Sequence, residues 1–434
     1  QSHKGGLRRG RRHIDGLQGF TDHHCGVRKV KKMIRLENIS FDHCIKCTVC
    51  TIYCPVARAT HLFPGPKQSG PDTERLRIKN PELVDESLKY CTNCKRCEIA
   101  CPSDVKIADI IQEAKWKHLK KKFRLRDFIM SRTDLVGTFA TLFSFIVNFF
   151  TGLLITRFMM DTFLKIPYRR IFPKYEMGTF RRWARRHLRR EKSGDFRERV
   201  VYFHGCYVNY NNHALGRDLI KVLRAMNIGV VIPDEKCCGV PLIANGYLKK
   251  ARKNARYNIA SLEKKLADEK MRIISTSSSC TYALKYEYAH LLAVDNSSIF
   301  NRIDYITEFI YHQFEAGNVP KMKPVHMRAA YHSPCHLERM GGVIYTIDLL
   351  KRIPGLDLVI LHSECCGIAG TYGFKNEYYD ISQSIGQELF KRIERSEPEY
   401  VITDCETCKM QIEMNTPYET LHPISVLARA LDID

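Results

Sequence analysis

The sequence contains no glycine-rich nucleotide-binding or flavin-binding motif and no recognised nucleic-acid-binding motif. It opens without the apolar core of a secretory signal peptide, which favours a reducing compartment. The chain has 434 residues, enough for two to four domains, and 18 of them are Cys. In a reducing compartment these thiols are expected to serve as metal ligands rather than to form disulfides.

Acidic residues are too few to balance the basic ones, and the formal net charge is +22. The excess is local, with ten Lys and Arg in residues 1–35 and thirteen in residues 165–199. In the second patch, arginine pairs recur every four residues from Arg181 to Arg190, which predicts one basic helix face. We interpret that face as a contact for an anionic membrane surface, with a purely solvated face as the alternative.

Cysteine spacing and local composition predict an α+β multidomain protein with a small helical domain followed by a duplicated α/β domain. Residues 1–35, which include an isolated Cys25, are interpreted as disordered or as an upstream extension. The remaining domains are expected at 36–112 (cysteine-dense), 113–198 (basic and apolar linker), 199–325 (first repeat) and 326–434 (second repeat).

Two cysteine runs in the first domain share the spacing C-x2-C-x2-C-x3-C-P of two-cluster ferredoxins. Three thiols of each run can reach one [4Fe–4S] cubane, while the fourth points to the other cubane. A zinc site would instead favour paired CxxC motifs. The spacing therefore predicts one cubane on Cys44, Cys47, Cys50 and Cys101, and another on Cys54, Cys91, Cys94 and Cys97.

The C-terminal half contains two copies of one pattern, in which short β-branched runs that lead into Cys alternate with helical stretches. The pattern predicts parallel strands that deliver their Cys at the carboxyl edge of each sheet. The second copy offers five converging thiols, expected to hold a metal centre: Cys335, Cys365, Cys366, Cys405 and Cys408. The first copy offers four, expected to hold a further cluster or a structural zinc: Cys206, Cys237, Cys238 and Cys280, with Ala283 in the place of a fifth.

Residues 135–156 carry no charged side chain, which satisfies the length requirement of a transmembrane helix. Thr, Ser and Asn recur every three to five residues through this stretch and form a polar stripe along an otherwise apolar helix. An amphipathic helix that lies in the membrane surface is the preferred interpretation. A true span, or packing against a partner protein, are the alternatives.

Longer motifs around these cysteines resemble the C-subunit family of bacterial anaerobic glycerol-3-phosphate dehydrogenases. The motifs are CIKCTVC at 44–50, PGPKQ at 64–68, KYC at 89–91, CPSDVKI at 101–107, FHGC at 203–206, CCGVPLIANG at 237–246, CCGIAGTYG at 365–373 and TDCETCK at 403–409. The repeats are also similar to those of heterodisulfide reductase, whose complete repeat binds a non-cubane [4Fe–4S] cluster through five Cys. The second repeat matches that pattern.

The resemblance implies an iron–sulfur subunit with no catalytic residue of its own. Such a subunit accepts electrons from flavoprotein subunits A and B, anchors them peripherally to the cytoplasmic face of the inner membrane, and passes electrons to menaquinone or ubiquinone. A heterodisulfide-reductase-like thiol–disulfide reductase subunit, or the iron–sulfur subunit of a related glycolate or lactate oxidase, are the alternatives. Nucleic acid is not an expected partner.

Overall fold

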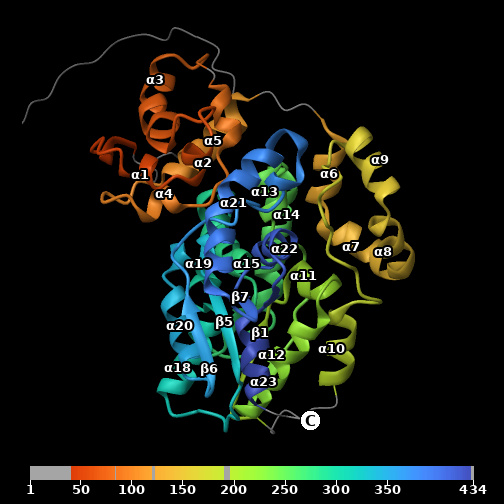
Figure 1. Cartoon of the computed structure of the whole chain (residues 1–434). Coiled ribbons are helices and arrows are strands. Elements are labelled where there is room, and N and C mark those ends of the chain that lie inside the picture. Colours follow the sequence, from red (N-terminus) through yellow and green to blue (C-terminus); the bar gives the residue numbers. More distant parts are fainter. Residues whose placement is uncertain (1–40, 84, 120–122, 190–195, 432–434) are drawn as a thin grey trace, which may run out of the picture. The chain divides into compact units, whose positions relative to one another are not determined.

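The structure is a computed structural model that describes residues 41–83, 85–119, 123–189 and 196–431 (Figure 1). The predicted extension at 1–35, with Cys25 and the first basic patch, lies outside the described residues.

A small helical domain carries both ferredoxin-type runs. Its elements are η2 (Phe41–His43), α1 (Val49–Ile52), α2 (Pro55–Ala59), η3 (Gln68–Asp72), α3 (Thr73–Lys79), η4 (Glu86–Tyr90), α4 (Arg96–Ile99) and α5 (Ile107–His118). Its apolar core, which includes Phe63, Leu88 and Ile111, is small and is built around the cysteines. Cys54 caps α2 by accepting the Ala57 N–H, and Pro55 follows at the first helical position, where its missing N–H costs nothing. The Cys-Pro pair thus starts a helix at the fourth thiol.

Both cysteine runs bend through left-handed backbone at the same two positions. Lys46 (φ 60°) and Thr48 (φ 68°) flank Cys47, while Asn93 (φ 57°) and Lys95 (φ 65°) flank Cys94. A side chain other than glycine costs about 1–2 kcal/mol in this conformation. The two loops therefore share one strained shape that turns three successive thiols toward a common point.

The C-terminal half contains two parallel sheets with equivalent strand orders. The first, β2-β1-β3-β4, consists of β1 (Glu198–Tyr202), β2 (Ile228–Val231), β3 (Arg272–Ser275) and β4 (Ile303–Tyr305). The second, β6-β5-β7-β8, consists of β5 (Met327–His332), β6 (Leu356–Ile360), β7 (Tyr400–Thr403) and β8 (Glu419–Leu421). The predicted duplicated α/β fold is confirmed, and each repeat adds a short fourth strand that the sequence analysis did not identify.

Helices connect the strands in the same order in both repeats. The first repeat contains α11 (Gly205–Tyr210), α12 (His213–Ala225), α13 (Val240–Ala244), α14 (Leu248–Glu263), α15 (Ser278–Tyr282), η5 (Ala283–Glu287), α16 (Tyr288–His290), α17 (Ser297–Phe300) and α18 (Ile306–Glu315). The second contains α19 (Cys335–Met340), α20 (Val343–Lys351), η6 (Tyr372–Phe374), α21 (Asn376–Ser396), α22 (Glu406–Asn415) and α23 (Pro423–Ala430).

The repeats pack against each other through equivalent helices. Helix α12 contacts α23, and α18 contacts α20. Because α12 and α20 occupy equivalent places in the two repeats, as do α23 and α18, these are the same contact with the repeats exchanged. One apolar core joins both sheets and includes Tyr202, Leu219, Tyr331 and Ile424. This exchange is the signature of an approximate two-fold relation between the repeats, and it brings the carboxyl ends of β3 and β7 together. There the Ser278 hydroxyl donates a hydrogen bond to the Asp404 carbonyl at 2.9 Å.

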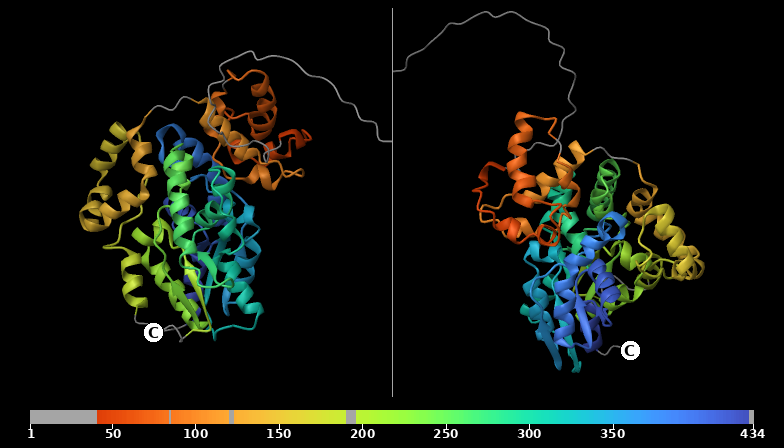
Figure 2. Two further views of the ribbon diagram at one scale, coloured as in Figure 1. Left: turned by 180° about the vertical axis from the view of Figure 1, so that it is seen from behind. Right: turned by 45° about the horizontal axis from the view of Figure 1, so that its top comes forward.

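The apolar stretch forms three short helices rather than the one helix expected from the sequence. After α6 (Leu125–Ser131) come α7 (Thr133–Leu142), α8 (Ser144–Gly152) and α9 (Leu154–Leu164), grouped beside α6 in every view (Figures 1 and 2). The breaks follow non-helical backbone at Phe143 and Leu153. Within the described residues, no single helix is long and apolar enough to cross a membrane, whereas α7 with α8, bent by 105°, passes on length and composition.

The polar stripe of this segment faces the protein. Asn148 exchanges two hydrogen bonds of 2.8 Å with the backbone of Tyr175, and Ser144 is buried. Thr138 bonds to Tyr210, a residue of α11. Apolar side chains face outward instead, with Phe145 81% and Phe163 76% exposed. The helices are therefore amphipathic as expected, but their polar side is the inner one.

The arginine-rich segment folds as α10 (Phe180–Leu188), anchored by buried Phe180 and Ala184. Its arginines do not form one free face, which corrects the expectation from the sequence. Arg181 points inward and donates to the Glu235 carbonyl, and Arg185 pairs with Asp234. Arg182, Arg186 and Arg189 are exposed, and Arg190 lies outside the described residues.

Candidate metal centres

The structure gathers Cys44, Cys47, Cys50 and Cys101 into one group. Burial raises the pKa of Cys50 to about 11, and repulsion from Cys44, Cys101 and Cys47 acts in the same direction. The fourth member comes from the second run, as interleaved ferredoxin spacing requires. Four neighbouring thiols of this kind can supply the ligands of one cluster.

Cys54, Cys91, Cys94 and Cys97 form a second group. Burial raises the pKa of Cys54 to about 12, and its thiol neighbours are Cys94 and Cys91. Burial also raises the pKa of Cys97, which faces Cys94, Cys91 and Cys54. The Gln112 amide contacts the Cys91 sulfur at 3.7 Å, and burial lowers the pKa of nearby Lys115 to about 8.

The five thiols of the second repeat meet at the carboxyl edge of its sheet. Cys366 and Cys408 sulfurs lie 3.2 Å apart. Cys365 neighbours Cys366, Cys405 neighbours Cys408, and Cys335 faces both Cys405 and Cys366. Gly367 (φ 86°) follows the Cys-Cys pair, where a Cβ would stand 2.0 Å from the Ser382 carbonyl oxygen. Only glycine fits there, so the Cys-Cys-Gly order is a steric requirement of this loop.

His332 adds a group to this site that the sequence analysis missed. Its ring nitrogen and the sulfurs of Cys366 and Cys408 all lie within 4.8 Å of one another, and all three residues are buried. The neighbouring thiols Cys365 and Cys408, and then His332, lower the pKa of Cys366. The signal in the sequence is a histidine at the carboxyl end of a strand, three residues before Cys335.

The four thiols of the first repeat also converge. Cys206 neighbours Cys237, and Cys238 neighbours both Cys237 and Cys280. The Thr133 hydroxyl, at the start of α7, donates a hydrogen bond to the Cys206 sulfur at 3.3 Å. This contact links the apolar helices directly to a candidate ligand.

Strand ends correct the position of the missing fifth thiol. Ser277 lies two residues beyond the end of β3 and caps α15, while Cys405 lies two residues beyond the end of β7 and caps α22. Cys280 follows Cys238 by 42 positions, as Cys408 follows Cys366. Ser277 is thus the counterpart of Cys405 and stands in the place of the missing fifth thiol, which the sequence analysis had assigned to Ala283.

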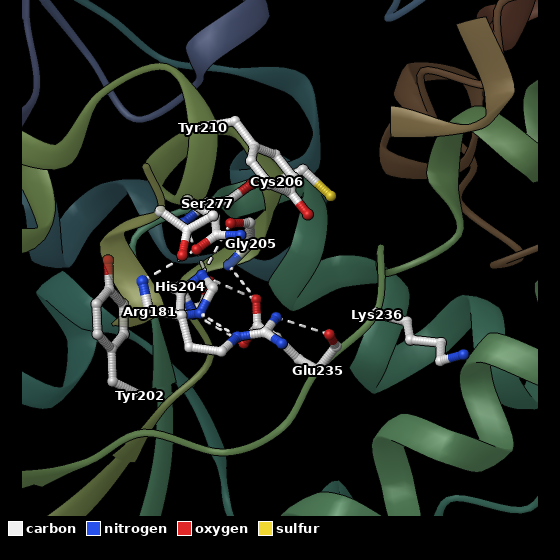
Figure 3. Close-up of polar contacts among 12 residues, drawn as sticks. Arg181, Tyr202, His204, Gly205, Cys206, Tyr210, Glu235, Lys236 and Ser277 are labelled. Carbon is white, nitrogen blue, oxygen red and sulfur yellow. Dashed lines mark hydrogen bonds and ion pairs between the residues drawn. The ribbon is translucent and has the colours of Figure 1, made fainter. Parts of the chain in front are cut away.

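A buried network supports the loop that carries Cys206 (Figure 3). The Glu235 carboxylate accepts hydrogen bonds from the backbone N–H groups of His204 (3.1 Å) and Gly205 (2.8 Å) and contacts the His204 ring at 3.0 Å. Arg181 donates to the Glu235 carbonyl at 2.7 Å. Burial raises the pKa of Glu235 to about 8 and lowers that of His204 to about 3. The network therefore fixes the Cys206 loop through buried hydrogen bonds, with Arg181 as its cation.

Arg96 joins the helical domain to the second repeat. Its guanidinium donates to the Ser363 carbonyl at 2.9 Å and pairs with Glu338 at 3.2 Å. Besides Glu338, its charged neighbours are Cys365, Cys94 and Cys335. One buried cation thus stands among thiols of the second ferredoxin-type group and of the five-thiol site. A positive charge there offsets the negative charge of metal-bound thiolates on both sides.

The donor sets fit iron–sulfur clusters. Every group consists of neighbouring thiols, at least one of them buried, and cluster iron takes thiolate ligands. Tight left-handed loops present the thiols of the first two groups, and strand ends present those of the others.

Comparison with known proteins agrees with this division. A 4Fe-4S dicluster domain model matches residues 40–105, and a cysteine-rich (CCG) domain model matches 200–285 and 329–413. The chain is 52% identical to the C-subunit of anaerobic glycerol-3-phosphate dehydrogenase from Escherichia coli, over 91% of the chain and 100% of the relative. It is 26% identical to the B-subunit of fumarate reductase (CoM/CoB) from Methanothermobacter marburgensis (93% and 73%). It is 23% identical to the D-subunit of dihydromethanophenazine:CoB–CoM heterodisulfide reductase from Methanosarcina barkeri (88% and 90%).

These features define an iron–sulfur electron-transfer subunit of an oxidoreductase complex, with a dicluster domain and two CCG domains. Within that class, the chain belongs to the C-subunit family of anaerobic glycerol-3-phosphate dehydrogenases.

Proposed function

We propose that this chain carries electrons from the flavoprotein subunits A and B of a glycerol-3-phosphate dehydrogenase to the quinone pool. The observation that carries the proposal is the Arg96 junction, where a guanidinium two residues after Cys94 binds the Ser363 carbonyl and Glu338, next to Cys365 and Cys335 in the second repeat. This junction gives a continuous series of thiol groups from the helical domain into the repeats. Identity of 52% with the C-subunit of such a dehydrogenase supports glycerol 3-phosphate as the substrate of the complex.

The thiol groups divide by type. The two interleaved groups of the helical domain suit [4Fe–4S] cubanes, and the five thiols of the second repeat suit a non-cubane [4Fe–4S] cluster. The first repeat, with Ser277 in place of a thiol, holds a further cluster or zinc on Cys206, Cys237, Cys238 and Cys280. Bound iron–sulfur clusters supply one-electron transfer at potentials that their hydrogen bonds and solvent exposure set. The chain's residues hold the ligands, exclude water and place Arg96 and His332 beside the sulfurs.

We also propose that the chain attaches peripherally to the cytoplasmic face of the membrane through α7, α8 and α9. Apolar side chains cover the outer side of these helices, with Phe145, Phe163 and Leu142 at least 66% exposed. A contiguous exposed apolar surface of this kind is unusual on a soluble protein and is typical of interfacial helices. Exposed Arg182, Arg186 and Arg189 of α10 add attraction to anionic headgroups.

The test is anaerobic co-purification of the full chain with its flavoprotein partners, followed by addition of glycerol 3-phosphate. We expect co-isolation and reduction of the iron–sulfur centres, seen as bleaching of their visible absorbance. An Arg96→Gln variant should slow reduction of the second-repeat centre more than that of the helical-domain centres. A complex whose centres stay oxidised with substrate present would overturn the proposal.

A further inference from the structure

A cavity of about 1530 Å³ lies among the thiol groups, within the part of the chain that the structure describes. Cys206 and Cys237 of the first repeat, Cys335 and Cys366 of the second, and Cys94 all contribute to its wall. Small-molecule pockets usually measure about 300–1,000 Å³. Metal centres would fill the thiol-lined ends, and the cavity extends well beyond them.

One part of the cavity wall, which we call the apolar arm, is formed by apolar and aromatic side chains that cannot bind a metal. Its wall includes Ile129 and Met130 of α6, Val136 of α7, and Phe172 and Tyr175 from the segment after α9. Met130 and Phe172 of this arm pack against the core that contains Cys366 and Cys408, so it lies beside the metal ligands. It suits a hydrophobic extension of a bound ligand.

The same α7 helix also forms part of the outer apolar surface. Val136 lines the cavity, while Leu135 (53% exposed), Phe139 (61%) and Leu142 (66%) face outward. Close packing fixes this helix, because a Cβ on Gly137 would stand 2.3 Å from the Tyr210 ring of α11. A single helix thus separates the apolar arm from the surface proposed to meet the membrane.

The cavity wall also offers polar groups beside the thiols. Thr133 lies beside Cys206, and Ser279 and His336, whose side chains contact each other at 3.2 Å, also line the wall. Hydroxyl and imidazole groups of this kind can hydrogen-bond the carbonyl oxygens of a flat polar head. The cavity therefore matches a ligand with a polar head and a long apolar tail.

We propose that this cavity binds an isoprenoid quinone, with its head between the two CCG sites and its tail along α6 and α7 toward the outer apolar surface. The proposal rests on the proposed function, which supplies the reductant: the quinone takes two electrons from the flavoprotein by way of the chain's centres, and two protons from water, to become the quinol. Entry from the membrane side brings a water-insoluble substrate to the metal ligands.

The test uses 2-heptyl-4-hydroxyquinoline N-oxide, a soluble quinone analogue whose fluorescence is quenched on binding, with the full, iron-loaded chain. Val136→Trp should fill the arm and weaken binding at least tenfold, and Ile129→Trp should do the same from α6. Phe139→Trp places the same side chain on the outer side of α7 and should bind like the wild type. Iron content and circular dichroism identify any variant that fails to fold. If either the Val136 or the Ile129 variant fails, the other still tests the pocket.

Equal binding by the Val136 and Ile129 variants and the wild type would overturn the assignment of this cavity as the quinone site. No binding by the wild type would overturn it as well. Reduction of a water-soluble dye by the complex with glycerol 3-phosphate separates this outcome from failure of the proposed function. If all variants still reduce the dye, electron transfer through the chain is intact, and the binding result then bears only on the pocket. Its absence in the wild-type complex would reject the proposed function itself.

Discussion

Ser277 occupies in the first repeat the place that Cys405 occupies in the second. Each residue lies two positions after the third strand of its sheet and caps the helix that follows. The Ser277 hydroxyl also donates a hydrogen bond to Glu406, the neighbour of Cys405, at 2.9 Å. The two counterparts thus lie close to the approximate two-fold axis, and they are the point at which the two metal-binding halves differ.

Replacement of Ser277 by Cys should complete a five-thiol set in the first repeat. We expect the Ser277→Cys chain, prepared anaerobically, to gain iron and to show an additional paramagnetic signal like that of the second repeat. Loss of the serine cap should cost about 1 kcal/mol or less, since sulfur can still accept the Cys280 N–H. Ala283→Cys is the control and should add no iron. A gain of iron in Ala283→Cys and none in Ser277→Cys would restore Ala283 as the place of the missing thiol.

His332 should tune the second-repeat centre without holding it alone. The equivalent residue of the first repeat is Phe203, so His332→Phe is a change that this fold already accepts. Loss of a hydrogen-bonding group beside Cys366 should lower the reduction potential of that centre and reduce electron delivery by about 10- to 100-fold. Redox titration followed by electron paramagnetic resonance gives the potential of each centre. An unchanged potential would show that the imidazole has no influence on the sulfurs.

Tyr305 should contribute to the attachment of one repeat to the other. Its hydroxyl donates to the Asp404 carboxylate at 3.0 Å across the interface, and burial raises the pKa of Asp404 to about 6. Tyr305→Phe leaves a buried carboxyl short of a donor, which should cost about 1–3 kcal/mol. Tyr202→Phe, which removes a bond to Thr276 inside the first repeat, should cost only about 0.5–1.5 kcal/mol. Thermal unfolding of the two variants compares them, and an equal or larger loss in Tyr202→Phe would contradict the assignment.

The outward apolar side chains of α7 and α8 should hold the chain on the membrane. Replacement of three of them together by Ser should release the chain into the soluble fraction, even at low salt. The three are Phe143, Ile146 and Phe150, all more than half exposed. Exposed apolar residues elsewhere provide the control, in which Tyr257, Val319 and Ile344 become Ser and attachment is retained. Sedimentation with vesicles of anionic phospholipid measures both variants. Wild-type chain that stays in the pellet after a high-pH carbonate wash, without partners, would indicate a span instead of surface attachment.

Much of the fold could be predicted from sequence because cysteine spacing and strand periodicity are local signals. The order of strands and helices in each repeat follows directly from runs such as Val200–Phe203 and Leu358–Leu361. The fourth strands escaped notice, since β4 and β8 have only three residues each.

The missed features differ in how far they depend on contacts between distant segments. The place of Ser277 could have been read from the equal spacing of 42 positions from Cys238 to Cys280 and from Cys366 to Cys408, and the ends of β3 and β7 agree with it. The polar stripe of 135–156 gave the correct amphipathic character but not the breaks at Phe143 and Leu153. Arg181 was expected to be part of a basic surface, yet the buried Glu235 loop draws it inward.

The left-handed residues of the two cysteine runs have a consequence for the cell. Lys46, Thr48, Asn93 and Lys95 each hold a conformation that costs about 1–2 kcal/mol, and a typical domain is stable by only about 5–15 kcal/mol. Without bound metal, nothing holds the thiols of each run together against this strain, so the loops should open and become accessible to proteases. Iron starvation should therefore shorten the lifetime of this subunit, so that its abundance, and not only its activity, follows the iron supply.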